Sequence, residues 1–399
     1  MFRISTSKLV LPIVIKITFF LIVIHSAQKS FAQNEKILVG ADQTELYLKD
    51  IQTKRIAVVA NQTSRIRSGN KYIHLIDTLI SMNINVKKVF APEHGFRGIA
   101  DAGEKVSDGI DIKTGVPIIT LYGENRKPRN KDLEDIDIVI FDVQDVGARF
   151  YTYISTMHLV MESVAENNKK IYVLDRPNPN GHYVDGPILD MKFKSFVGMH
   201  PVPIVHGMTV GEFAMMINEE GWLKKGIKSD LKVIPLKNYD RKIIYDLPIK
   251  PSPNLPNKQS INLYPSLCFF EQTDISIGRG TNMQFQIFGD PNWDNKLFSF
   301  TPKSMSGAKF PKHQNTKCYG FDLSNQGILS QINLEWLIFA YNNSKDKLSF
   351  FKKGFVRLAG NNILQKQIEN GKTANQIRAG WKKGIKKFKN LRKNYLLYD

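Results

Sequence analysis

The stretch INVKKVFAPEHGFRG, residues 84–98, contains a strand and the polar loop that follows it. Its apolar residues up to position 90 predict a short buried strand, which Pro92 ends because proline cannot donate to a strand ladder. The glycines of the loop allow a sharp turn and a close approach to a ligand. Glu93, His94 and Arg97 therefore follow the carboxyl end of a strand, where ligands bind in open α/β sheets. A polar turn without a ligand is the simpler alternative.

The same pattern recurs along the first part of the chain. Runs of β-forming residues alternate with segments of helical periodicity, which predicts a mostly parallel sheet with helices on both faces. Strands are expected at 55–60, 84–90, 117–121, 136–141, 171–174 and 231–235, and helices at 74–82, 156–168 and 209–220. Thr209 is the expected N-cap of the last helix, and Glu212 completes a capping box. The sequence thus predicts an α/β fold with a Rossmann-like, mostly parallel sheet domain.

Polar side chains follow several of these strands where the strands end. They are Asn61, Glu93, Asp142 and Asp175. Because the carboxyl ends of parallel strands meet at one edge of a sheet, we expect these residues to form a site there.

The chain of 399 residues is longer than one average domain. A proline-rich passage at 247–256 fixes an extended path, and beyond it the composition shifts toward aromatic residues. We therefore predict a domain boundary here, with a Rossmann-like domain at 33–247 and a smaller α+β domain at 248–399 that closes over it.

The first residues have the pattern of a signal peptide. A basic start and an apolar run, which Lys16 interrupts, precede the small residues Ser30 and Ala32. We expect residues 1–32 to be removed and the protein to be exported, either to the periplasm or to the medium. An uncleaved membrane anchor is the alternative, but the run is short for a span.

The formal net charge of +19 favours anionic surroundings. Export makes nucleic acid the least favoured partner, and we expect none. Much of the charge lies at 382–389, where lysines alternate with apolar residues at helical spacing, which predicts an amphipathic helix with a solvated basic face. Cys268 and Cys318 would permit one disulfide, but the sequence does not establish it. The oligomeric state is left open.

Several common motifs are absent from the sequence. It contains no G-x-G-x-x-G, P-loop, H-E-x-x-H, G-x-S-x-G or C-x-x-C. Their absence argues against NAD enzymes, NTPases, common zinc peptidases and α/β-hydrolase esterases. We expect neither a metal nor an organic cofactor.

A second polar cluster is FDVQDVGARFYT, residues 141–152. It combines acids, an amide, a guanidinium and a phenol, a mixture that suits sugar hydroxyls. The candidate ligands are Asp142, Gln144, Asp145, Arg149 and Tyr151. A salt-bridged loop, with Arg149 neutralising one of the acids, is the alternative.

Further candidates follow later strands and occur in the second domain. They are Asp175 and Arg176 in a turn-forming segment, His206 before a helix, and Glu271 and Arg279, the latter between two glycines. Ordinary turns and a structural histidine are the alternatives.

Together these segments resemble the exo-β-N-acetylmuramidases of the NamZ type. The matching blocks are Asn61–Thr63, APEHGFRG at 91–98, Leu121–Gly123, FDVQDVGARFYTY at 141–153, DRPNP at 175–179, HGMTVGE at 206–212, PSPNLP at 251–256, GRGT at 278–281 and Tyr395–Tyr398. They cover nearly all of the chain after residue 33. The chain departs from the usual pattern at 270–274, which reads FEQTD, and at Gln284-Phe285.

The resemblance implies an exo-acting glycoside hydrolase that releases N-acetylmuramic acid from the non-reducing end of peptidoglycan fragments such as muropeptides. It also implies a cleft between the two domains, and Glu93 matches the proposed catalytic glutamate. Asn254 is an expected substrate ligand within the matching block at 251–256.

The mechanistic hypothesis assigns Glu93 as the general acid, which requires surroundings that raise its pKa. Glycoside hydrolysis commonly uses a second carboxyl group. Asp142 is our choice, although Asp145, Asp175, Glu271 and the 2-acetamido group of the sugar are alternatives. A nearby Arg97 would oppose the acid role unless its guanidinium points to the substrate.

An arginine is expected to bind the lactyl carboxylate of the sugar, because a guanidinium matches a carboxylate in a bidentate pair. The candidates are Arg97, Arg149, Arg176 and Arg279. Two other functions stay open: an exported muropeptide- or sugar-binding protein without turnover, and a different wall hydrolase such as an amidase.

Overall fold

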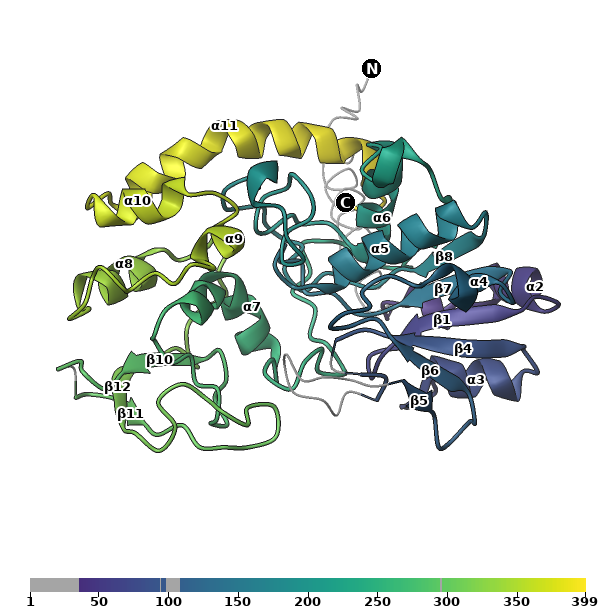
Figure 1. The fold of residues 1–399 in the computed structure, drawn as a ribbon, viewed down its shortest axis with the longest axis horizontal. Coiled ribbons are helices and arrows are strands. Elements are labelled where there is room, and N and C mark those ends of the chain that lie inside the picture. The colour runs from purple at the N-terminus through teal and green to yellow at the C-terminus, as the bar shows by residue number, and fades with distance from the viewer. Residues whose placement is uncertain (1–35, 94, 98–107, 295) are drawn as a thin grey trace, which may run out of the picture.

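The computed structural model describes residues 36–93, 95–97, 108–294 and 296–399. The expected signal peptide and His94 lie outside them. Figure 1 shows two lobes, one built around a large sheet and the other around short helices and a small sheet. The strands are β1 (Ile56–Ala60), β2 (Arg65–Ser68), β3 (Lys71–His74), β4 (Val86–Ala91), β5 (Gly109–Ile110), β6 (Pro117–Thr120), β7 (Ile138–Asp142), β8 (Lys170–Leu174), β9 (Asp230–Ile234), β10 (Ile287–Asp290), β11 (Ser299–Phe300) and β12 (Cys318–Asp322). The α-helices are α2 (Leu48–Ile51), α3 (Leu75–Ser81), α4 (Asn130–Leu133), α5 (Tyr153–Glu166), α6 (Val210–Glu219), α7 (Lys258–Leu267), α8 (Glu335–Asn342), α9 (Phe355–Ala359), α10 (Ile363–Glu369) and α11 (Ala374–Arg392).

The large sheet has seven strands in the order β5-β6-β4-β1-β7-β8-β9. All neighbours pair in parallel except β5, which is antiparallel to β6 at the edge. The chain therefore starts in the middle at β1, builds outward through β4 and β6, and then returns to build through β7, β8 and β9. This is the doubly wound arrangement of Rossmann-like domains, and it confirms the predicted α/β class.

Each central strand is buried on both faces. Alternate residues of β1 belong to two separate cores, with Val59 in one and Val58 in the other. Helices α5 and α6 cover the first face, and α2 and α3 cover the second. Burial on both faces explains why the strands read as continuous apolar runs and not as an alternating pattern.

The helix boundaries follow from capping and packing. Thr209 caps α6 and Glu212 completes the capping box, as predicted. Helix α5 begins at Tyr153, before the predicted residue 156, because Tyr153 and Ile154 are buried in the core. Tertiary packing extends this helix beyond the part that its periodicity indicates.

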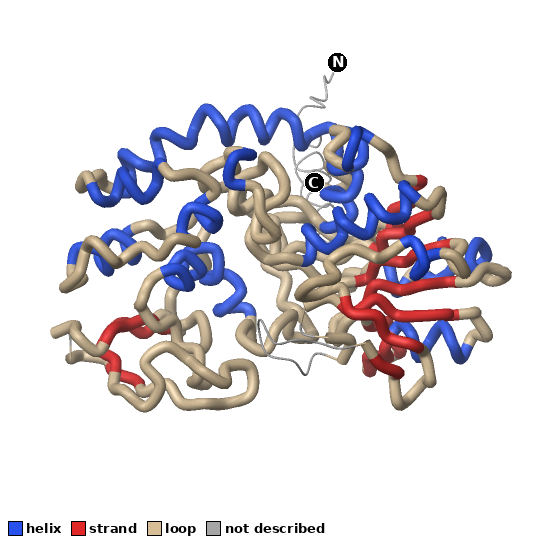
Figure 2. Tube along the Cα trace, in the orientation of Figure 1, coloured by secondary structure: helices blue, strands red, loops and turns tan. Residues whose placement is uncertain are grey.

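The second lobe is the predicted smaller α+β unit. It contains the antiparallel sheet β10-β12-β11 and the helices α7 to α11. Figure 2 shows its short strands apart from the large sheet. None of the helices in the described part of the chain is long and apolar enough to cross a membrane.

Helix α11 runs from the second lobe back to the first (Figure 1). Ile377, Trp381 and Phe388 are buried, whereas the lysines at 382, 383, 386, 387 and 389 are exposed. The predicted amphipathic helix with a solvated basic face is therefore confirmed.

The residues after α11 attach the end of the chain to the first lobe. The Tyr398 hydroxyl donates to Asp175 Oδ2 at 2.7 Å and accepts from the backbone N–H of Leu236 at 2.8 Å. The backbone carbonyl of Tyr398 accepts from Arg241. Asp175, predicted to bind substrate, is instead a buried structural acceptor, since its oxygens also receive bonds from Thr209 and Gly211.

Arg149 joins the two lobes and is not placed to bind substrate. Its side chain is fully buried, and its terminal nitrogens donate to four backbone carbonyls at 2.8–3.0 Å. Two of these, from Pro187 and Val202, belong to the first lobe, and those of Leu358 and Ala359 belong to the second. The predicted substrate role is wrong because the side chain is fully buried and these carbonyls engage both of its terminal nitrogens.

His206 is a structural histidine, which was the alternative interpretation of its position in the sequence. It is 1% exposed, its ring lies 4.8 Å from that of Phe213, and its Nδ1 accepts from the backbone of Met208. Burial, together with the charges of Arg392 and Arg149, lowers the pKa of His206 to about 3. The ring is therefore neutral in the folded protein at neutral and mildly acidic pH.

This histidine should make folding sensitive to acid. In the unfolded chain His206 binds a proton below about pH 6.5, but in the folded protein it does so only near pH 3. The free energy of unfolding should therefore decrease as the pH is lowered through this window. The contribution of this group is about 1.4 kcal/mol per pH unit. In H206N the side-chain oxygen can replace Nδ1 as the acceptor, and this contribution disappears. Urea unfolding of both proteins between pH 4 and 7 measures it, and equal pH slopes would contradict it.

Candidate functional site

A cavity of about 400 Å³ lies where the carboxyl edge of the large sheet meets the second lobe. Its lining combines carboxyl groups, guanidinium groups and aromatic rings from both lobes. The described lining residues are Glu93, Tyr122, Arg126, Phe150–Tyr153, Ser195–Val197, Ser252, Asn254, Leu255, Tyr264, Cys268, Glu271, Gln272, Arg279, Phe285, Arg357 and Leu358.

Glu93 enters this cavity from the loop after β4. Gly95, with φ of 75°, closes the turn by donating to the carbonyl of Pro92. The half-buried Glu93 carboxyl accepts a hydrogen bond of 2.9 Å from the Thr152 hydroxyl, just before α5. Burial and the negative charge of Glu93 raise the pKa of Tyr122 to about 12, so this phenol stays protonated beside the carboxyl group. Glu93 thus has hydroxyl neighbours.

Glu271 brings a second carboxyl group into the same cavity from the second lobe. Its Oε1 pairs with Arg279 Nε at 2.7 Å. Lys312 lies close by, where its ammonium donates to the backbone carbonyl of Glu271. Burial acts to raise the pKa of Glu271, but the charges of Arg279 and Lys312 outweigh it and hold the pKa below its usual value. Glu271 is therefore ionised at neutral pH.

The remaining walls suit a sugar. Tyr151 and Tyr264 pack edge to face, with 5.7 Å between their ring centroids, and the Tyr151 hydroxyl donates to the carbonyl of Pro251. Asn254 donates to the carbonyl of Gly307, but its buried Oδ1 receives no hydrogen bond from the described residues. An aromatic wall and an unused amide oxygen match the ring face and the donors of a carbohydrate.

Two arginines of this cavity were not among the sequence candidates. Arg126 lies over the Phe196 ring at 4.4 Å, and its Nε donates to the carbonyl of Gly123. Arg357 lines the same cavity and is exposed. Neither forms an ion pair with a carboxylate of the described residues. Arg126 follows the matching block at 121–123 closely, which was the available signal.

Asp142, our choice for the second carboxyl group, does not line this cavity. It is fully buried, and Arg176 holds it through contacts of 2.6 and 2.9 Å to its two oxygens. The choice was wrong because a buried carboxylate in a bidentate ion pair has no access to substrate. Glu271 is the alternative from that list that lines the cavity with Glu93.

The other residues of the loops around the sheet edge have supporting contacts. Asp145 is buried, accepts from the backbone N–H of Gly147, and has its pKa raised to about 7 by burial. Asn61 donates to the Tyr153 hydroxyl, which orients that ring. Arg97 pairs with Asp111 at 2.7 Å and with Asp77 at 3.4 Å. These carboxylates hold the guanidinium of Arg97, which removes the predicted conflict with an acid role for Glu93.

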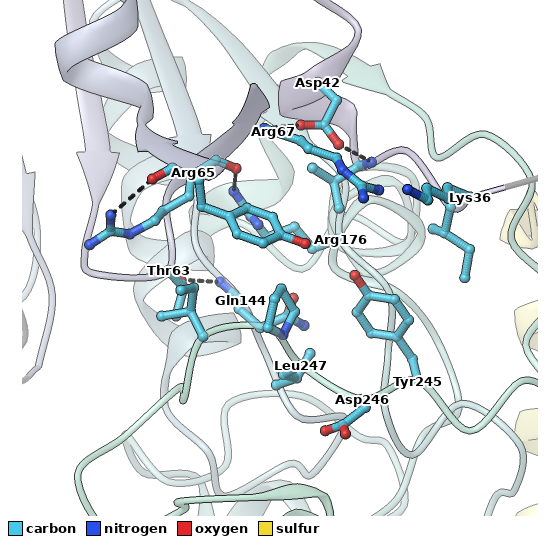
Figure 3. A pocket seen from close by; sticks show the side chains of 15 residues that line it. Lys36, Asp42, Thr63, Arg65, Arg67, Gln144, Arg176, Tyr245, Asp246 and Leu247 are labelled. Atoms are coloured by element: carbon cyan, nitrogen blue, oxygen red, sulfur yellow. Dashed lines mark hydrogen bonds between the residues drawn. The ribbon is translucent and has the colours of Figure 1, made fainter. Parts of the chain in front are cut away.

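The predicted residues thus separate into groups. Glu93, Tyr151, Asn254, Glu271 and Arg279 meet in one cavity. Gln144 and Arg176 line a second cavity of about 290 Å³, whose labelled residues are drawn in Figure 3. The other predicted residues do not appear among the described lining residues of either cavity: Asn61, Arg97, Asp142, Asp145, Arg149, Asp175 and His206.

Metal ligands and a disulfide are not seen in the described part of the chain. No group of three histidine, cysteine, aspartate or glutamate residues there is arranged to hold a metal ion. Cys268 and Cys318 are both buried free thiols.

Comparisons with known proteins extend these observations. Residues 56–259 match the family model described as exo-beta-N-acetylmuramidase NamZ, N-terminal, and residues 262–398 match its C-terminal counterpart. The chain is 37% identical over 396 residues to the Bacillus subtilis (strain 168) protein named peptidoglycan beta-N-acetylmuramidase NamZ, covering 92% of each protein.

Solved structures of two Bacteroides fragilis proteins, both titled as DUF1343 family proteins, have the same fold. One is 49% identical with a TM-score of 0.84, over 92% of this chain and 99% of the other. The second is 27% identical with a TM-score of 0.76, over 91% of this chain and 99% of the other. The matches cover both lobes and nearly all of each relative, and the chain belongs to the NamZ family of exo-β-N-acetylmuramidases.

Proposed function

We propose that this protein is an exo-acting glycoside hydrolase that releases N-acetylmuramic acid from the non-reducing end of peptidoglycan fragments. The observation that carries the proposal is the cavity that Glu93 and Glu271 share, one from each lobe. Its aromatic walls and the unpaired Asn254 oxygen support a sugar as the ligand. Such an activity serves turnover and recycling of the cell wall.

Glu93 is proposed as the general acid. Its proton passes to the bridging oxygen while the bond between that oxygen and C1 of the sugar breaks. The groups beside the carboxyl of Glu93 are the hydroxyl of Thr152 and the phenol of Tyr122, which line the same cavity. Arg97 does not disturb this arrangement, since its partners are Asp77 and Asp111.

Glu271 is proposed as the second carboxyl group. Its negative charge, maintained by Arg279 and Lys312, would stabilise the positive charge that develops at C1. The group that attacks C1, whether water, Glu271 or the 2-acetamido group of the sugar, determines the stereochemistry, and proton NMR of the released anomer reports it.

We also propose that residues 1–32 direct export and that the enzyme meets its substrate in the periplasm or the medium. The basic and apolar pattern of these residues supports this. The domain boundary near 247–256 stays a proposal, which the proline-rich composition supports.

Replacement of Glu93 tests the acid role. In E93Q we expect kcat to fall by about 10² to 10⁴ on a muramyl disaccharide, whose sugar leaving group needs a proton. An aryl glycoside with an acidic phenol needs less protonation, so its loss should be clearly smaller. KM should change little, since the amide has nearly the same shape. Near-normal turnover of the disaccharide would remove Glu93 from this role, and wild-type binding without release would favour a binding protein.

Glu271 is tested by comparison with its ion-pair partner. In E271Q we expect kcat to fall by at least about 10²-fold, because the charge facing the transition state is lost. R279K keeps a positive charge beside Glu271, so the carboxylate stays ionised and KM should change more than kcat. Steady-state kinetics of both variants decide this, and equal losses of kcat would mean that Glu271 acts only by holding Arg279.

Arg126 is proposed to bind the lactyl carboxylate, in place of the arginines predicted from sequence. Its guanidinium has no carboxylate partner among the described residues and is held over Phe196. In R126Q, competitive inhibition by free N-acetylmuramic acid should weaken about tenfold or more. Inhibition by N-acetylglucosamine, which lacks the lactyl group, should change less than about twofold. Equal weakening for both sugars would contradict the assignment, and the exposed surface variant K387Q serves as the control.

A further inference from the structure

The second cavity lies at the topological switch point of the large sheet. Strand β1 has β4 on one side and β7 on the other, so the chain leaves the carboxyl ends of β1 and β7 in opposite directions. Thr63 and Gln144, from the loops after these strands, line the cavity. Doubly wound sheets bind ligands in the crevice at this point. The Glu93 cavity is lined by the loop after β4, by Phe150–Tyr153 from the segment after β7 and by the second lobe. The two cavities share no described lining residue, and the switch-point cavity has no assigned role.

Two buried side chains give this cavity fixed polar groups. Arg176 is 6% exposed and uses Nε and Nη2 on Asp142 and on the carbonyl of Arg65. Its Nη1 has no acceptor among the described residues. Gln144 is 4% exposed and donates its amide nitrogen to the carbonyls of Asp145 and Pro177. Its Oε1 receives no hydrogen bond within the described part of the chain. A donor and an acceptor are thus held ready for a ligand.

The rim of the cavity has a surplus of positive charge. Lys36, Arg65 and Arg67 line it, together with the two carboxylates of Asp42 and Asp246. None of the three cations forms an ion pair with a carboxylate of the described residues. The oxygens of Asp42 already accept from the backbone N–H groups of Val39 and Arg67. Figure 3 shows the head groups of Lys36 and Arg67 turned toward the same space, with the hydroxyl of Tyr245 directed toward it from below.

The donor set favours a carboxylate over a phosphate. Phosphate sites at this point of a sheet use a glycine-rich turn and the N-terminus of the next helix. Here the hairpin β2–β3 follows β1, and no glycine is among the described lining residues. Guanidinium groups match a planar carboxylate through paired hydrogen bonds. Val39, Leu247 and Ile249 offer an apolar wall to the rest of the ligand.

We propose that this cavity is a second, non-catalytic binding site for a small ligand with a free carboxylate. The candidate ligands rest on the proposed function. Its product, N-acetylmuramic acid, and its substrates, fragments with peptide carboxylates, both carry a free carboxylate. Residues 245–249 line this cavity, and the same segment continues to Ser252 and Asn254 in the Glu93 cavity. Pro251, between them, is held by Gln62 and Tyr151.

Isothermal titration calorimetry of ligand binding to the wild type and to R67Q tests the site. The probes are N-acetylmuramic acid, the dipeptide D-alanyl-D-alanine, neutral N-acetylglucosamine and inorganic phosphate. We expect one or both carboxylate probes to bind the wild type at this site and to bind R67Q at least about tenfold more weakly. Which carboxylate binds identifies the source. K36Q, at an exposed position, provides a second variant should R67Q fold poorly.

The variant R126Q distinguishes binding in the Glu93 cavity from binding at this second site. That variant should lose the sugar binding that competitive inhibition reports, yet retain the binding that R67Q loses. Absence of carboxylate binding, tighter binding of phosphate, or equal affinities in the wild type, R67Q and K36Q would overturn the proposal. Release of N-acetylmuramic acid by the wild type is assayed independently, so a failure of the proposed function is distinguishable from a failure of the second site.

Discussion

The buried ion pair of Asp142 and Arg176 is the interaction on which the carboxyl edge of the sheet depends. Asp142 ends β7 and is fully buried, so its charge must be matched inside the protein. Arg176, from the loop after β8, meets both of its oxygens and also reaches the carbonyl of Arg65 in the hairpin. Three loops are thereby fixed to one another. The pair excludes Asp142 from chemistry and aims the remaining nitrogen of Arg176 at the switch-point cavity.

The two carboxyl groups of the Glu93 cavity have different partners from each other, and neither is closed off as Asp142 is. Glu93 has hydroxyl neighbours, whereas Glu271 is flanked by an arginine and a lysine. Different environments for two carboxyl groups are what an acid and a charged partner require. Because the groups come from different lobes, the relative position of the lobes sets the geometry of the reaction. The buried Arg149 holds that position through backbone carbonyls of both lobes.

The end of the chain reinforces the same arrangement. Helix α11 packs one apolar stripe inward, and Tyr398 then hydrogen-bonds to Asp175 at the carboxyl end of β8. The last residues of the smaller lobe therefore contribute to the core of the larger one. The basic face of α11 stays in solvent, which accounts for a large part of the net charge without involving either cavity.

The sequence by itself determined the parallel strands of the large sheet, the helices α3, α5 and α6, and the loop that carries Glu93. These follow from local patterns of apolar residues, prolines and capping groups, and the resemblance to NamZ proteins supplied the reaction. The sequence did not predict the hairpin β2–β3, the antiparallel edge strand β5 or the short helices α2 and α4. Only the tertiary structure decided which polar residues are free to act. Asp142, Asp175, Arg149 and Arg176 share the residue types of an active site, but burial obliges each of them to find protein partners. Glu271 and Arg126 reach the site from segments far from Glu93 in the sequence, and no local pattern encodes such a distance.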